Sequence, residues 1–149
     1  MKHELIGGFA GLALGLMSHA ATAQGMPAPE GAEVYFVNLE DGATVPSPVT
    51  VAFGLKGMGV APAGTEKEMT GHHHLLINRA PLGEGPDGAD ELLYGLPADE
   101  NHVHFGGGQT ETTLDLPAGT HTLQLVLGDM NHVPHSPPVV SEVITITVE

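Results

Sequence analysis

The chain has 149 residues, of which 18 are acidic and four basic, so its formal net charge at pH 7 is −14. This balance argues against nucleic acid and anionic lipid as partners, because both require clustered positive charge. There are no cysteines, which excludes disulfides and thiolate chemistry, so the core and any bound metal must hold the fold.

The N-terminus has the pattern of a signal peptide. Residues 5–17 form an apolar run that is too short to span a bilayer comfortably, and no later run is longer. Ala21-Thr22-Ala23 offers the small-x-small motif of signal peptidase, so cleavage is expected before Gln24 and the product is expected in the periplasm or secreted. The expected division is a signal peptide at 1–23, a flexible leader at 24–32 and a single domain at 33–149.

The rest of the chain predicts many short strands, since it is rich in glycine and proline and has no long amphipathic period. The clearest case is 49–55, where Val49, Val51, Phe53 and Leu55 alternate with small or polar residues. That period of two is typical of a half-buried antiparallel strand. In chain order, the expected strands are 33–39, 49–55, 72–78, 101–105, 110–116, 121–127 and 139–148, with one helical turn within 90–96.

Seven strands, no internal repeat and one compact unit predict an all-β fold, an immunoglobulin-like antiparallel β-sandwich. The segment LPAGTHTL (116–123) resembles the corner before the sixth strand of bacterial immunoglobulin-like domains. In that interpretation His121 bonds back to the preceding turn, is poorly exposed and lies far from the other histidines. A jelly roll or another small sandwich is the alternative.

Seven histidines fall in three short clusters, which lie at 72–74, 102–104 and 132–135. Residues two apart in a strand point to the same side. His72 with His74, and His102 with His104, can therefore each present two imidazoles to one ion. In an immunoglobulin-like sandwich the loops beside all three clusters lie at one pole, so we expect the clusters to converge there.

Imidazole binds zinc, copper and nickel well and calcium or magnesium poorly, so a copper or zinc ion is the expected cofactor. Met69 and Met130 adjoin two of the clusters, and their thioethers would favour Cu(I). Asp129 is a candidate ligand or an acceptor that orients an imidazole N–H. The first-choice ligands are His72, His74, His102 and His104, followed by His132, His135 and Asp129.

Other interpretations stay open for several of these residues. His73 shares a strand face with Leu75 and Ile77, so we expect a packed, hydrogen-bonded core residue. His132 and His135 lie in a proline-rich loop, where solvated or turn-capping histidines are also common.

Three segments resemble an uncharacterised bacterial exported family catalogued as domain of unknown function 4399. They are GHHHLLIN (71–78), PADENHVHFGGGQTETTLDLPAGTHTLQLVLGDMNHVPH (97–135) and PPVVSEVITITV (137–148). The resemblance covers most of the chain after the expected cleavage site and implies no activity. It implies a family signature that includes His72, His73, His74, His102, His104, Gln109, His121, Asp129, His132 and His135.

The sequence thus favours an exported protein that binds copper or zinc for binding, storage or delivery. One alternative is a module of the cell envelope that binds a partner protein or a non-metal ligand. Another is a histidine-metal enzyme, either hydrolytic through an activated water or similar to copper–zinc superoxide dismutase, which His102-Val103-His104 resembles. The cysteines of that family are missing, and no catalytic Ser/His/Asp or paired-carboxylate arrangement is legible.

Overall fold

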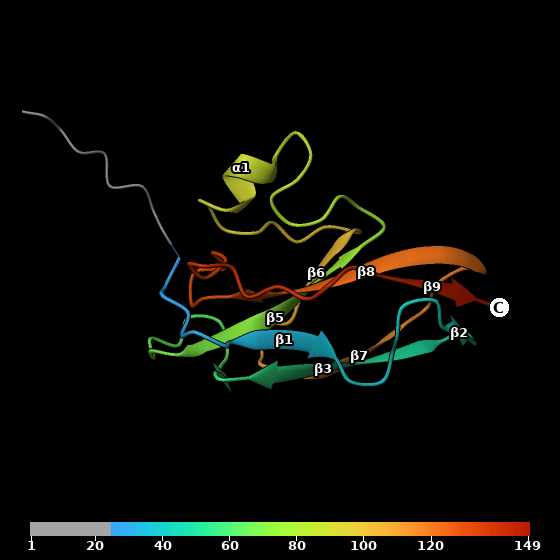
Figure 1. Cartoon of the computed structure of the whole chain (residues 1–149), viewed down its shortest axis with the longest axis horizontal. Coiled ribbons are helices and arrows are strands. Elements are labelled where there is room, and N and C mark those ends of the chain that lie inside the picture. The colour runs from blue at the N-terminus through green and yellow to red at the C-terminus, as the bar shows by residue number, and fades with distance from the viewer. Residues whose placement is uncertain (1–24) are drawn as a thin grey trace, which may run out of the picture.

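The computed structural model describes residues 25–149, so the predicted signal peptide and its cleavage site lie outside the described residues. Two sheets form a β-sandwich (Figure 1). The first has the order β1-β3-β7 and consists of β1 (Glu33–Phe36), β3 (Val49–Lys56) and β7 (Glu111–Leu114). The second has the order β2-β9-β8-β5-β4 and consists of β2 (Thr44–Val45), β9 (Ile144–Val148), β8 (Gly119–Gly128), β5 (Thr70–Ile77) and β4 (Gly59–Val60), with β6 (His102–His104) also paired to β5.

The core lies between the sheets and is built by the alternation that the sequence predicts. Val49, Val51 and Phe53 of β3 point inward, and β9 repeats this period of two. β8 is buried continuously over 123–128, and its leucines at 123, 125 and 127 belong to the core. Burying one such aliphatic side chain contributes roughly 1.5–3 kcal/mol. The innermost residues are Val51, Leu75, Leu123, Leu125, Leu127 and Ile146, all at 0% exposure.

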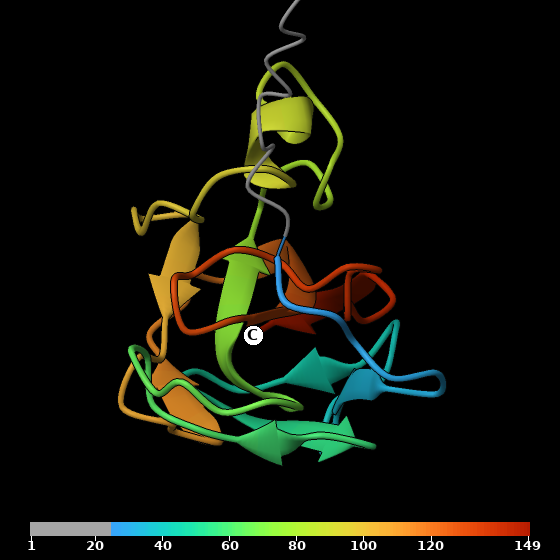
Figure 2. The ribbon, with the colours of Figure 1, turned by 90° about the vertical axis from the view of Figure 1, so that its left-hand side faces the viewer.

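β5 is buried on both faces, and this decides where its histidines lie. Leu75 and Ile77 belong to the sandwich core, whereas Leu76 belongs to a second cluster with Val126 and Leu96. The segment 78–101, which includes α1 (Gly88–Glu91), covers this second face of the sheet (Figures 1 and 2). Side chains on the outer face of β5 are therefore enclosed as well.

The all-β sandwich is thereby confirmed, whereas the immunoglobulin-like assignment stays a prediction. The prediction that the histidine clusters converge at a pole of loops is corrected. β6 is hydrogen-bonded alongside β5 in the same sheet, so the two His-x-His pairs are side by side on neighbouring strands. The two-residue strands β2 and β4 were not expected, because two residues show no period.

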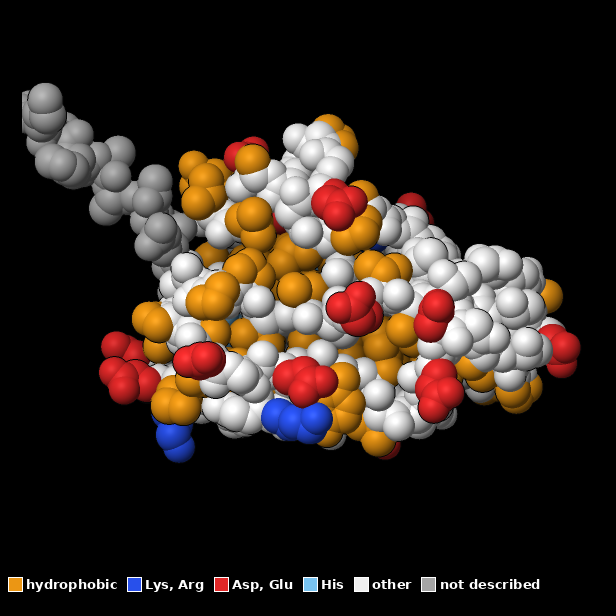
Figure 3. Space-filling view, in the orientation of Figure 1, with side chains coloured by type: hydrophobic (Ala, Val, Ile, Leu, Met, Phe, Trp, Pro, Cys, Tyr) orange, Lys and Arg blue, Asp and Glu red, His pale blue; other side chains and the backbone are white. Residues whose placement is uncertain are grey.

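The segment 24–32 was expected as a flexible leader, and its described part, 25–32, is hydrogen-bonded to the loop after β8. Ala28 N donates to Ser136 O at 3.1 Å, and Ser136 N donates to Met26 O at 3.0 Å. The face of the molecule in Figure 3 carries scattered acidic side chains and few basic ones, as the net charge of −14 requires. Over residues 25–149, no helix has the length and apolar character needed to cross a membrane.

Candidate metal centre

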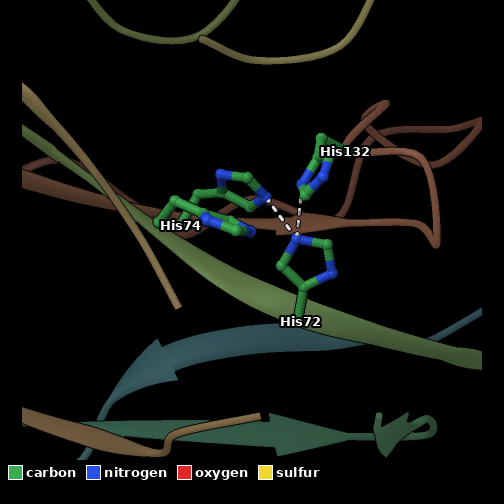
Figure 4. A group of neighbouring side chains, drawn as sticks. His72, His74 and His132 are labelled. Carbon is green, nitrogen blue, oxygen red and sulfur yellow. Dashed lines mark hydrogen bonds between the residues drawn. The ribbon is translucent and has the colours of Figure 1, made fainter. Parts of the chain in front are cut away.

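Four histidines from three segments meet on the outer face of the larger sheet. His72 and His74 come from β5, His104 from β6 and His132 from the loop after β8, and one ring nitrogen of each lies within 4.8 Å of the others. His72 Nε2 is 2.9 Å from His74 Nε2 and 3.1 Å from His132 Nδ1 (Figure 4). His72 and His74 are fully buried, but His104 and His132 are half-buried, so the cluster has one accessible side.

Strand register brings the first three rings together. His74 is paired with His104 on β6 and with Val126 on β8, and His72 is paired with Gly128. Paired residues of an antiparallel ladder point to the same side, and so do residues two apart in one strand. Three imidazoles therefore share the outer face.

The loop 129–135 supplies the fourth ring and is organised by Asp129. Its Oδ1 accepts hydrogen bonds from the backbone N–H of Asn131 at 2.8 Å and of Val133 at 3.1 Å. Its Oδ2 accepts a third from Met26 N at 3.1 Å. His132 has a φ of +66°, a left-handed conformation that a non-glycine residue keeps only where its surroundings hold it. Asp129 is thus outside the group of four and shapes the loop that presents His132.

Two further histidines from the predicted ligand set lie outside the group of four. His102 is fully buried, and its Nε2 lies 2.9 Å from His74 Nδ1, on the opposite edge of that ring from the cluster. The ring nitrogens of His135 lie 3.2 Å from Leu127 O and 3.1 Å from Thr70 O. His102 therefore supports a member of the group, and His135 ties the start of β5 to β8.

Two glycines leave room for the rings, and their role was not predicted from the sequence. A Cβ at Gly128 would lie 2.5 Å from His74 Nε2, and a Cβ at Gly106 would lie 2.7 Å from His104 Nε2. Both separations are too short for non-bonded atoms, so any side chain at these positions would push the imidazoles aside. The only sequence signal was their place, since Gly106 directly follows the expected strand 101–105 and Gly128 directly follows the expected strand 121–127.

Three rings of the cluster and the neighbouring His102 have lowered pKa values. Burial lowers the pKa of His72 to about 4 and the pKa of His74 to about 2, and repulsion from the neighbouring imidazoles adds to both shifts. Burial also lowers the pKa of His104, with His132 as a further cause. Burial and the nearby Arg79 lower the pKa of His102. These rings are therefore in the neutral form that binds metals.

The spacing of the nitrogens is near that of a tetrahedral site. Four nitrogens at 2.0–2.1 Å from a zinc ion lie roughly 3.3 Å apart. The His72–His74 and His72–His132 nitrogen pairs, at 2.9 and 3.1 Å, are a few tenths of an ångström closer than this, and all four nitrogens lie within 4.8 Å of one another, so an ion would require the rings to adjust in both directions. His104 Nε2 is buried and has no hydrogen-bond partner among the described residues, which leaves it available.

The two histidines expected to be structural lie apart from the cluster. His73 is buried in the sandwich core, with its ring centroid 5.2 Å from that of Phe53. Neither ring nitrogen forms a hydrogen bond of good geometry among residues 25–149, but a contact with the Gln109 backbone opposes the lowering of the His73 pKa by burial. The predicted packing is confirmed, and the predicted hydrogen bonding is reduced to this weak backbone contact. His121 is 6% exposed and its Nε2 donates to Pro117 O at 2.8 Å, so the predicted corner bond is confirmed.

A large surface cavity lies away from this chemistry. It has a volume of about 530 Å³, lies beneath the segment 79–101, and is lined by Arg79 and several acidic residues but by no histidine. Size alone therefore does not identify the functional site, and the four imidazoles are the stronger candidate.

Comparison with known proteins yields a family and no activity. No curated protein and no solved structure matches the chain. One family model, described as "Domain of unknown function (DUF4399)", matches residues 51–149, a span that includes all four clustered histidines. The chain therefore belongs to the DUF4399 family.

Proposed function

We propose that the protein binds one copper or zinc ion through four imidazoles. The observation that carries this proposal is the convergence of four ring nitrogens within 4.8 Å of one another. Uncharged imidazole is a good donor for copper and zinc and a poor one for calcium or magnesium. The proposed ligands are His72, His74, His104 and His132.

Four protein donors favour binding over catalysis. A catalytic zinc site keeps three protein ligands and an open position for water, whereas four ligands complete a tetrahedral shell. Hydrolysis or superoxide turnover would require a further coordination position on the ion for water or superoxide. We therefore propose a role in storage or delivery, and the half-buried His104 and His132 give the ion a side from which to enter and leave.

The place of action is also a proposal. The predicted signal peptide and the lack of cysteines suit an oxidising compartment outside the cytoplasm, where metal handling cannot rely on reduced thiols. An envelope protein that supplies or receives the ion is the partner that this role implies.

The test is a thermal melt at pH 7.5 with and without Zn(II) or Cu(II). A metal that binds only the folded state stabilises it by roughly 2.7 kcal/mol at about a hundredfold excess over the dissociation constant. Each kcal/mol should raise the midpoint by about 2–8 °C for a domain of this size. The expected result is a clear upward shift for the native chain, together with one equivalent of metal by elemental analysis.

Matched variants decide where the metal binds. His104→Ala/His132→Ala removes the two half-buried rings and should abolish the shift, while the fully buried pair stays in place. The control is Glu84→Gln/Asp87→Asn/Asp90→Asn, which removes exposed acidic groups and should keep the shift. A shift that survives in the histidine variant and disappears in the acidic control would reject the proposed site. Superoxide turnover by the copper-loaded protein above that of free copper would favour the alternative of a histidine-metal enzyme.

A further inference from the structure

The methionines of the described chain gather at one end of the sandwich. Gly59 N donates to Met69 O at 2.9 Å, Gly64 N donates to Met130 O at 2.9 Å, and Met26 N donates to Asp129 Oδ2 at 3.1 Å. These bonds connect the segments that carry all the methionines of residues 25–149, which are Met26, Met58, Met69 and Met130.

Two of these methionines line one surface cavity. It has a volume of about 350 Å³ and is lined by Met26 and Met69 together with Glu68 and the segment 27–29. No lysine or arginine lines it, so the only formal charge among its lining residues is the carboxylate of Glu68. The lining therefore combines two methionines with one negative charge.

Met69 has both an exposure and a backbone conformation that are unusual for a methionine. Its side chain is 52% exposed, and its φ of +55° places it in the left-handed region. A long apolar side chain gains nothing from exposure, and this backbone conformation is uncommon for residues other than glycine, asparagine and aspartate. A position that breaks two local preferences at once is where a functional constraint is expected.

Thioether sulfur selects soft ions. Methionine binds Cu(I) in preference to hard cations such as calcium or magnesium, whose ligands are oxygens. The histidine cluster, by contrast, offers only nitrogen donors and suits Zn(II) or Cu(II). The two sites thus differ in the ions they favour, and can be tested separately.

We propose that the Met26/Met69 cavity is a second metal site, which binds a soft monovalent ion of the Cu(I) class at the protein surface. It adjoins the histidine centre, because Met69 precedes His72 by three residues, roughly 10 Å of extended chain. In addition, the Asp129 carboxylate accepts a hydrogen bond from Met26 N and also shapes the loop that carries His132. Transfer of the ion from this cavity to the histidines is the part that rests on the proposed function.

The first experiment follows the four methionine methyl groups by NMR during a titration with Ag(I), a redox-inert probe for Cu(I). The sample is the chain without the predicted signal peptide, with its methionine methyl groups labelled with ¹³C. The signals of Met26 and Met69 should shift with saturation, and that of Met130, which lines neither this cavity nor the neighbouring one shared by Met58 and Met69, should not. Equal shifts of all four methyls, or none at Met26 and Met69, would overturn the proposal.

The second experiment compares near-isosteric variants. Met26→Leu/Met69→Leu should weaken Cu(I) binding by at least the 10–100-fold typical of lost supporting contacts at a metal site. The control Met130→Leu, outside the lining of this cavity, should bind as the native chain does, in anaerobic competition with a chromophoric Cu(I) chelator. Unchanged Cu(I) affinity in the double variant would reject the thioether site. Zn(II) and Cu(II) binding should be unaffected in both variants, and the absence of both from the native chain would instead reject the proposed histidine centre.

Discussion

At the scale of single residues, His102 shows how one ring can control another. Its Nε2 faces His74 Nδ1 at 2.9 Å, while the other nitrogen of His74 faces His72 at 2.9 Å. If His74 binds a metal through Nε2, its proton must be on Nδ1, and His102 is then the acceptor of that N–H. His102 thereby sets the tautomer and the orientation of a buried ligand without joining the ligand set.

Replacing His102 tests this role. His102→Leu should lower metal affinity by about 10–100-fold, because the N–H of His74 would lose its acceptor. His102→Gln, whose amide oxygen accepts, should recover part of that loss. Affinities would be measured by competition with a chromophoric chelator, and ¹⁵N NMR would report the tautomer of His74. A leucine variant that binds as tightly as the native chain, with the same tautomer, would mean that His102 only fills space.

At the scale of elements, the loop 129–135 is the part of the site that a strand pattern does not specify. Its conformation depends on three backbone N–H groups that converge on one carboxylate, two of them inside the loop and one from Met26. The loop is also attached to the covering segment, since Leu96 N donates to His132 O at 2.8 Å. The sheet thus presents three imidazoles on a rigid surface, and this loop adds the fourth.

Asp129→Asn should therefore weaken metal binding through His132. The amide keeps one acceptor oxygen but turns an NH₂ group toward other donors, so at least one of the three backbone bonds is lost. The measurement is a double-mutant cycle on metal affinity with His132→Ala. Asp129→Asn should cost affinity in the native chain and much less in the His132→Ala background. Equal losses in both backgrounds would separate the loop from the site.

Much of the fold and part of the site could be predicted from the sequence. The features that could not be predicted depend on contacts between segments that are distant in the chain. Alternation located the segment of β3 and placed His72 with His74 on one face, because side-chain direction follows directly from a period of two. Partnership between strands is not local, so the sequence placed β6 wrongly in space although it located its residues. Spacing also could not distinguish a ligand such as His104 from its supporter His102, which shares the same strand.

At the scale of the whole molecule, an acidic surface encloses uncharged imidazoles. Burial lowers the pKa of His72 and His73 to about 4 and that of His74 to about 2. In the unfolded chain the same groups titrate near pH 6.5. Between pH 6.5 and pH 4 the unfolded chain consequently binds more protons than the folded one, and acid favours unfolding.

The metal-free protein should lose stability as the pH falls below about 6.5. Protonation of each of the three rings in the unfolded chain can lower the free energy of unfolding by up to about 1.4 kcal/mol per pH unit. For His72 and His73 this loss is complete near pH 4. Urea unfolding at pH 7.5, 6.5, 5.5 and 5 would measure this, with NMR titration of the imidazoles as the control. A free energy of unfolding that stays level or rises between pH 6.5 and 5, or buried rings that titrate near pH 6.5, would contradict the expectation.

The sequence separation of the clustered rings has a topological consequence. His72 and His132 are 60 positions apart, yet their nitrogens are 3.1 Å from each other, and the chain contains no cysteine. An ion held by both would close a loop of that length, and a covalent bridge over such a loop restricts the unfolded chain by about 4 kcal/mol. A bound metal would thus act as a detachable cross-link. The same event that loads the protein with its ion would tighten the fold, and release of the ion would loosen it.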